Sequence, residues 1–111
     1  MTEKETRVTF IDKKKEDKFK ALKDNKPYEK LHHFITRAIA DLKKEPTTGT
    51  KIPKKLWPKD YIKKYGVTNL WKYDLPDAWR LLYTISKDKV LIVSIILDWF
   101  SHKDYERKFK Y

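Results

Sequence analysis

The run VLIVSIIL, residues 90–97, constrains the fold more than any other stretch of this sequence. Its residues are apolar on both faces of a strand, and only Ser94 interrupts them. Such a run is typical of a central strand that is covered on each side. It is much shorter than the ~18 apolar residues that a membrane-spanning helix needs, and we expect no membrane partner. The sequence therefore predicts a sheet built around residues 90–97.

A second pattern predicts a helix after the Asn25-Lys26-Pro27 break. Apolar side chains recur there with helical spacing and form one continuous face, which consists of Leu31, Phe34, Ile35, Ala38, Ile39 and Leu42. Glu45-Pro46 ends this helix. Before the break, Asp12 is a suitable N-cap for a thinner amphipathic helix. We expect the two helices to form a hairpin after a short strand at residues 7–11.

Strand patterns dominate the second half of the chain. Three apolar or alternating stretches, separated by the turn sequences DLPD and SKDK, predict strands at residues 67–73, 78–85 and 90–97. Ser101 and Asp104 then form a capping signal for a short terminal helix. The predicted fold class is α+β, with an N-terminal strand, a helical hairpin packed on a small antiparallel sheet of about four strands, and a short C-terminal helix.

One domain accounts for residues 1–111, and residues 46–66 form a basic connecting segment within it. This segment holds both glycines, three of the five prolines and six lysines. WPKDYIKKYG predicts a short helix between Pro58 and Gly66, with Trp57, Tyr61 and Tyr65 on one side. These rings either stack on bases while the lysines follow phosphates, or pack beneath the segment while the lysines stay solvated.

The charge balance points to a polyanionic partner. Lys and Arg number 27 against 16 acidic residues, which gives a net charge of +11. Nucleic acid is the favoured partner, ahead of an acidic protein or a membrane surface, although lysine also serves solubility. The chain has no cysteine and no apolar leader, so we expect a cytoplasmic protein without disulfides. His32 and His33 point to different sides of their helix, so neither a metal site nor a cofactor is expected.

Arg80 is the most unusual residue of the predicted strands. In AWRLLYTI it alternates with Trp79 and Leu81, so it projects from the sheet face opposite the stronger apolar set. We expect that face to be the more open one, with Arg80 near the start of its strand and beside a cleft. The alternative is that Arg80 forms an ion pair with Asp98 or with another acid.

The order of the predicted elements, with WRLLYTI followed by VLIVSIIL and then SHKDYERKF, resembles the RelE/ParE superfamily of type II toxin–antitoxin toxins. Members have an aromatic-Arg-aliphatic-aliphatic-Tyr strand, then an apolar strand, then a tail with His or Arg and Tyr. The resemblance covers most of the chain and is most specific over residues 70–105. Lys72 stands alone where RelE-type sequences have a lysine pair.

This resemblance implies an mRNA endonuclease that acts at the ribosomal A site and is held inactive by a cognate antitoxin protein. Arg80 matches the strand arginine, His102 the acid or base of the tail, and Tyr105 the tail tyrosine. Metal-free cleavage by 2′-hydroxyl attack needs cationic donors and a group that exchanges protons near neutral pH, which suits Arg80 and His102. Lysine side chains at Lys54, Lys55 and Lys72 are the candidate RNA contacts.

Other interpretations of the same residues stay open. The protein could be a non-catalytic toxin that poisons a protein target such as DNA gyrase, or a basic RNA- or ribosome-binding module. His102 could serve only to cap the tail helix, and Tyr105 could pack with Phe109 in the core. A protein poison needs no proton-transfer group, so the His102 and Tyr105 tail favours the endonuclease.

Overall fold

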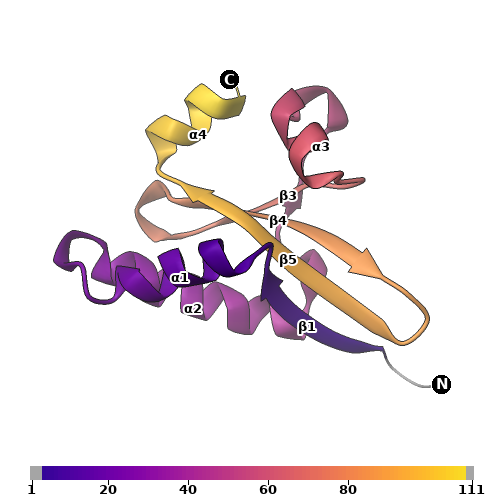
Figure 1. Ribbon diagram of the computed structural model, residues 1–111, viewed down its shortest axis with the longest axis horizontal. Coiled ribbons are helices and arrows are strands. Elements are labelled where there is room, and N and C mark those ends of the chain that lie inside the picture. The colour runs from indigo at the N-terminus through magenta and orange to yellow at the C-terminus, as the bar shows by residue number, and fades with distance from the viewer. Residues whose placement is uncertain (1–3, 110–111) are drawn as a thin grey trace.

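A twisted five-stranded sheet lies between two groups of helices in the computed structural model, which describes residues 4–109 (Figure 1). Short 3-10 turns connect several of the regular elements. The elements are β1 (Glu5–Phe10), α1 (Lys13–Leu22), α2 (Glu29–Lys44), β2 (Thr50–Lys51), α3 (Lys59–Tyr65), β3 (Trp71–Asp74), β4 (Arg80–Lys87), β5 (Leu91–Phe100) and α4 (His102–Phe109).

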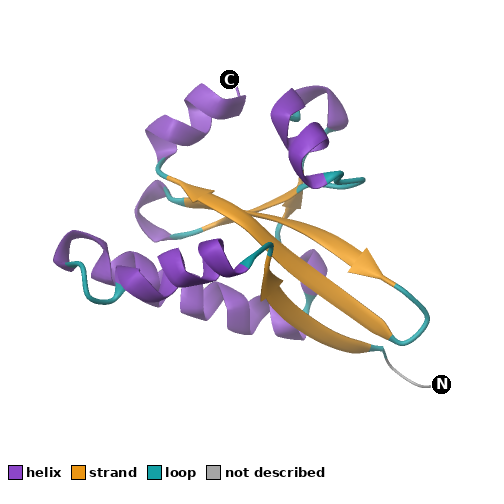
Figure 2. Cartoon of the chain, in the orientation of Figure 1, coloured by secondary structure: helices purple, strands orange, loops and turns teal. Residues whose placement is uncertain are grey.

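The strand order is β1-β5-β4-β3-β2, so β5 is an interior strand as its apolar run predicts. The predicted α+β class is confirmed, with its N-terminal strand, helical hairpin and short C-terminal helix, but the sheet differs from the expected antiparallel sheet of about four strands in two details. The sheet has a fifth strand, β2, whose two residues pair with β3 at the edge and are too few to give a periodic signal. In addition, β1 runs parallel to β5 with Glu5 opposite Leu91, which makes the sheet mixed. Figure 2 shows the strands in orange between the helices.

The helical hairpin of α1 and α2 covers one face of the sheet and builds the first core. Helix α2 buries Leu31, Ile35, Ala38 and Leu42, four of the six positions that its periodicity marks, and the other two are partly buried against the same core. They meet Leu81, Tyr83 and Ile96 from β4 and β5. Burial of these side chains supplies the main stabilisation of this layer, at about 1.5–3 kcal/mol for each large apolar side chain.

Helices α3 and α4 cover the opposite face and build a second core. Its buried residues come from the connecting segment, the sheet and the tail: Ile52, Tyr61, Val67, Leu70, Leu82, Leu97, Tyr105 and Phe109. The expectation that the Arg80 face is open is therefore wrong. The apolar rings of the connecting segment and of the tail, which the sequence could not place in space, close most of it.

Local signals set the ends of the helices. The carboxylate of Asp12 accepts a hydrogen bond of 2.8 Å from the backbone N–H of Lys15 and caps α1, as expected. Gly66 ends α3 in the left-handed conformation, at φ 59°, and its N–H donates to the carbonyl oxygen of Ile62. Along the described chain, every helix is too short or too polar to cross a membrane.

Candidate functional site

Arg80 is the first residue of β4, and its side chain is only 19 % exposed. Its Nε atom lies 3.0 Å from Oδ1 of Asp74, so the two residues form an ion pair across the β3–β4 turn. One terminal nitrogen, Nη1, donates to the carbonyl oxygen of Trp79 at 3.3 Å. The ion pair that the sequence left open as an alternative is present, but its acid is Asp74 and not Asp98.

Lys72 joins the same carboxylate from the neighbouring β3. Its Nζ atom lies 3.0 Å from Oδ1 of Asp74 and 3.4 Å from Oδ2, and its side chain is 21 % exposed. The cations of Lys72 and Arg80 thus approach one oxygen atom of Asp74. The structure thus brings together Lys72, a candidate RNA contact, and Arg80, a candidate catalytic residue.

Tyr105 lies beneath Arg80. The guanidinium carbon is 5.7 Å from the centroid of the Tyr105 ring, within the range of a cation–π contact. The ring is 3 % exposed and stacks on Phe109 with their centroids 4.5 Å apart. Tyr105 is therefore a core residue that also orients Arg80, and it has no free ring face on which an RNA base could stack.

His102 begins α4 and lies at the surface. Its side chain is 56 % exposed, and Nε2 contacts a carboxylate oxygen of Glu106 one turn further along the helix. The capping role belongs to Ser101, whose hydroxyl accepts a hydrogen bond from the N–H of Asp104. His102 follows Phe100, the register partner of Arg80, by two residues, so both lie at the same end of the sheet.

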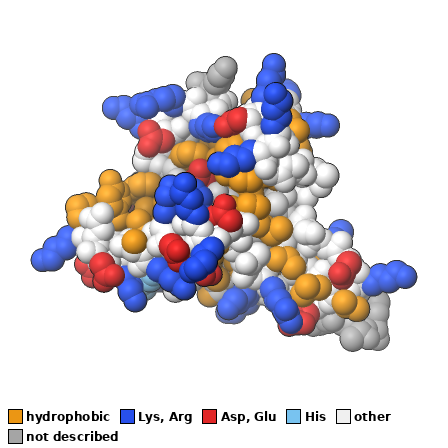
Figure 3. Space-filling view, viewed as in Figure 1, with side chains coloured by type: hydrophobic (Ala, Val, Ile, Leu, Met, Phe, Trp, Pro, Cys, Tyr) orange, Lys and Arg blue, Asp and Glu red, His pale blue; other side chains and the backbone are white. Residues whose placement is uncertain are grey.

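Lys54 and Lys55 are exposed in a 3-10 turn that precedes α3. Lys55 borders an open groove of about 680 Å³ between this segment and α4, with Lys59, Arg107 and Lys108 also on its walls. Figure 3 shows basic side chains over α3 and α4, with acidic side chains among them. The walls of the groove also hold Asp60, whose pKa is lowered by a hydrogen bond from Lys108.

The aromatic side chains of the connecting segment pack beneath it. Tyr61 is buried, and Trp57 and Tyr65 are half-buried against the second core. Trp57 donates its indole N–H to the carbonyl oxygen of Ile52 at 2.8 Å. The second interpretation of this segment is therefore correct: its rings pack beneath it and its lysines are solvated. Lys54 and Lys55 remain available at the surface.

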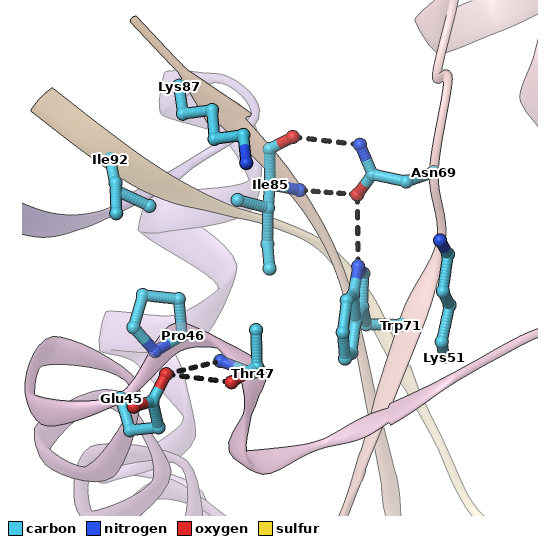
Figure 4. A pocket seen from close by; sticks show the side chains of 9 residues that line it. All are labelled: Glu45, Pro46, Thr47, Lys51, Asn69, Trp71, Ile85, Lys87 and Ile92. Atoms are coloured by element: carbon cyan, nitrogen blue, oxygen red, sulfur yellow. Dashed lines mark hydrogen bonds between the residues drawn. The ribbon is translucent and has the colours of Figure 1, made fainter. Parts of the chain in front are cut away.

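A separate hollow of about 300 Å³ lies on the α2 side of the sheet (Figure 4). Four of its polar residues, Asn69, Trp71, Glu45 and Thr47, bond to one another or to the backbone, while Lys51 and Lys87 also line it. Asn69 bonds to the backbone of Ile85 and accepts from the indole N–H of Trp71, and Glu45 accepts from Thr47. These hydrogen bonds stabilise the fold.

Asp74 is the site residue that the sequence reasoning missed. The signal was present, because Asp74 begins the DLPD turn and Arg80 follows it, so the two become register partners when residues 75–79 close a hairpin. Over residues 4–109, no cluster of three or more His, Asp or Glu side chains has the geometry to hold a metal ion.

Comparison with known proteins identified no relative. No protein-family model matches the chain, and no curated protein or solved structure is significantly similar to it. Any function must therefore be argued from the residues and their arrangement.

Proposed function

We propose that this chain is a RelE/ParE-type toxin that binds mRNA on the ribosome and cleaves it by 2′-hydroxyl attack. The observation that carries the proposal is the convergence of Arg80, Lys72 and Tyr105 at the end of the sheet where His102 begins α4. The element order supports it too, because a strand, a helical hairpin, a basic segment, a three-stranded meander and a short tail follow one another as in that superfamily.

In this proposal, Arg80 and Lys72 bind the non-bridging oxygens of the scissile phosphate. Charge on these oxygens grows as the 2′-oxygen bonds to phosphorus, so two fixed cations stabilise the transition state more than the substrate. The Tyr105 ring holds the guanidinium in place from below. Lys54 and Lys55 contact phosphates further along the strand.

His102 exchanges the protons. It takes the proton of the 2′-hydroxyl as the 2′-oxygen bonds to phosphorus and the bond to the 5′-oxygen breaks. The leaving 5′-oxygen takes a proton from water, which gives a 2′,3′-cyclic phosphate and a 5′-hydroxyl. His102 must leave Glu106 and turn toward the phosphate to do this, and its exposed position leaves room for that rotation.

Labelled mRNA incubated with and without translating ribosomes tests the proposal. Wild type should cleave only with ribosomes, and Arg80→Ala and His102→Ala should each lose at least ~100-fold in rate. Arg7→Ala and His33→Ala are matched controls, because both residues are exposed and lie on other elements. RNA that is bound but left intact would replace the endonuclease with a binding module, and an absence of binding would overturn both.

A further inference from the structure

We propose that Oδ1 of Asp74 occupies the position of a phosphate oxygen, so that Asp74 is an internal competitor for the RNA phosphate at the Lys72–Arg80 site. This inference rests on the proposed function only in taking an RNA phosphodiester as the ligand. The key geometry is that a single carboxylate oxygen lies 3.0 Å from both Nζ of Lys72 and Nε of Arg80.

The contact with Arg80 is an incomplete one. The Nε atom of Arg80 is buried, yet within the described part of the chain no acceptor is aligned with its N–H, not even the nearby Asp74 oxygen. Buried N–H groups normally have an acceptor, and an arginine paired with an ideal anion donates through two parallel hydrogen bonds. The Asp74 carboxylate thus satisfies the charge of Arg80 without satisfying its hydrogen-bonding geometry.

The two sides of this contact differ in exposure and in what packs against them. Lys72 and Arg80 are about one-fifth exposed and are held on paired strands, with the guanidinium over the Tyr105 ring. The Asp74 side chain is 56 % exposed at the last position of β3. The fixed cations form the site, and the exposed carboxylate is the group that can leave it.

There is open space beside Asp74 into which its side chain can rotate. Asp74 borders an open groove of about 560 Å³ between α2 and β3, and Arg37 lies on the wall of that groove. Rotation toward the groove would free both Lys72 and Arg80 and place the carboxylate in a groove that Arg37 and Asp41 both line. A phosphate, with two non-bridging oxygens, can then contact both cations at once.

Asp74→Asn removes the competing charge and keeps the shape of the side chain. Asp77→Asn is the matched control, because it removes the same charge from an exposed residue three positions away, whose φ of 59° asparagine accepts. The probe is a fluorescent 2′-O-methyl RNA oligonucleotide, which binds but cannot be cleaved. Asp74→Asn should bind it about two- to fivefold more tightly than Asp77→Asn does, as expected for the loss of a partly exposed ion pair.

Equal affinity of the two variants would overturn the inference. Poly-glutamate is the second probe. If Asp74→Asn gains as much affinity for poly-glutamate as for the RNA, the site binds anions in general and is not specific for phosphate. Arg80 Nε–H NMR signals, followed during titration with inorganic phosphate, should shift at lower phosphate in Asp74→Asn than in Asp77→Asn. None of these probes can be cleaved, so a difference between the two variants supports the phosphate site whether or not wild type cleaves mRNA. Intact mRNA with wild type would overturn only the proposed endonuclease activity.

Discussion

The side-chain amide of Asn69 pairs with the backbone of Ile85 as a residue of a neighbouring strand would. Its Nδ2 donates to the carbonyl oxygen of Ile85 at 2.8 Å, and its Oδ1 accepts from the N–H of Ile85, also at 2.8 Å. The backbone carbonyl of Asn69 accepts from the hydroxyl of Thr84 at 2.7 Å. Asn69 thus continues the pairing with β4 on the N-terminal side of Trp71, where the regular pairing of β3 begins.

Asn69→Ala should destabilise the protein by about 1–3 kcal/mol, because it removes partners from both polar groups of Ile85 and from the indole N–H of Trp71. The measurement is urea unfolding followed by tryptophan fluorescence. Asn25→Ala is the matched control, since Asn25 is exposed and its side chain makes no capping hydrogen bond. Equal midpoints for the two variants would show that the Asn69 amide is not a strand substitute.

Tyr83 ties the segment after α2 to the sheet. Its hydroxyl donates to the carbonyl oxygen of Pro46 at 2.7 Å and accepts from the N–H of Gly49 at 3.1 Å, and its ring is fully buried. Tyr83→Phe keeps the ring but leaves both backbone groups without this partner. We expect a loss of about 1–3 kcal/mol in the free energy of unfolding. Tyr28→Phe, at an exposed ring, should change it by less than about 0.5 kcal/mol.

Alkaline pH should destabilise the fold through Tyr83 and Tyr73, because the pKa of each is raised in the folded state. Burial raises the pKa of Tyr83 to about 12, and burial together with the hydrogen bond to Asp41 raises the pKa of Tyr73 to about 12. Below pH ~10, the usual tyrosine pKa, both states are protonated and the stabilisation is complete. Between pH ~10 and 12 the unfolded chain loses these protons first, so stability falls.

Double-mutant comparison isolates this effect from the titration of the lysines. The free energy of unfolding of Tyr73→Phe/Tyr83→Phe should fall less between pH 9 and pH 12 than that of wild type, even though the variant is less stable at pH 7. Urea unfolding at several pH values gives the two slopes. Parallel curves for wild type and variant would contradict the prediction.

Much of the fold follows from local patterns. The α2 face, the interior position of β5 and the caps at Asp12 and Gly66 all depend on residues close in sequence, and each was predicted correctly. Strand β5 continues past the predicted end at residue 97 to Phe100, because Asp98 finds partners in Lys15 and Tyr61 that only the tertiary structure supplies.

The arrangement of the elements in space was harder to predict from the sequence. Periodicity identifies a strand but not its neighbour, so the parallel pairing of β1 with β5 had no sequence signal. The cover over the Arg80 face of the sheet depends on Tyr61 of α3 and on Tyr105 and Phe109 of α4, two helices far apart in sequence. The sequence analysis allowed for an ion pair between Arg80 and an acid but did not identify Asp74 as that acid. Asp74 is the partner because the register of the hairpin places it opposite Arg80.

The two glycines should respond differently to alanine. At Gly66 a Cβ atom would meet nothing within 4 Å, so only the left-handed backbone opposes it, at about 1–2 kcal/mol. At Gly49, φ is an ordinary −78°, but a Cβ atom would lie 2.5 Å from the carbonyl oxygen of Lys72 and from the hydroxyl of Tyr83. Gly49→Ala should therefore be the more destabilising change in thermal unfolding, and a reversed order would show that the segment shifts freely.

Lys72 should contribute one phosphate contact to RNA binding. Each contact with single-stranded nucleic acid adds about 0.7 to the slope of log affinity against log salt concentration, because a condensed counterion is released. Lys72→Ala should reduce that slope by about this amount for the 2′-O-methyl oligonucleotide. Lys30→Ala, an exposed lysine of α2, is the control and should leave the slope unchanged. Equal slopes for the two variants would place the RNA strand away from β3, and Arg80 would then remain an ion-pair partner of Asp74 with no phosphate to bind.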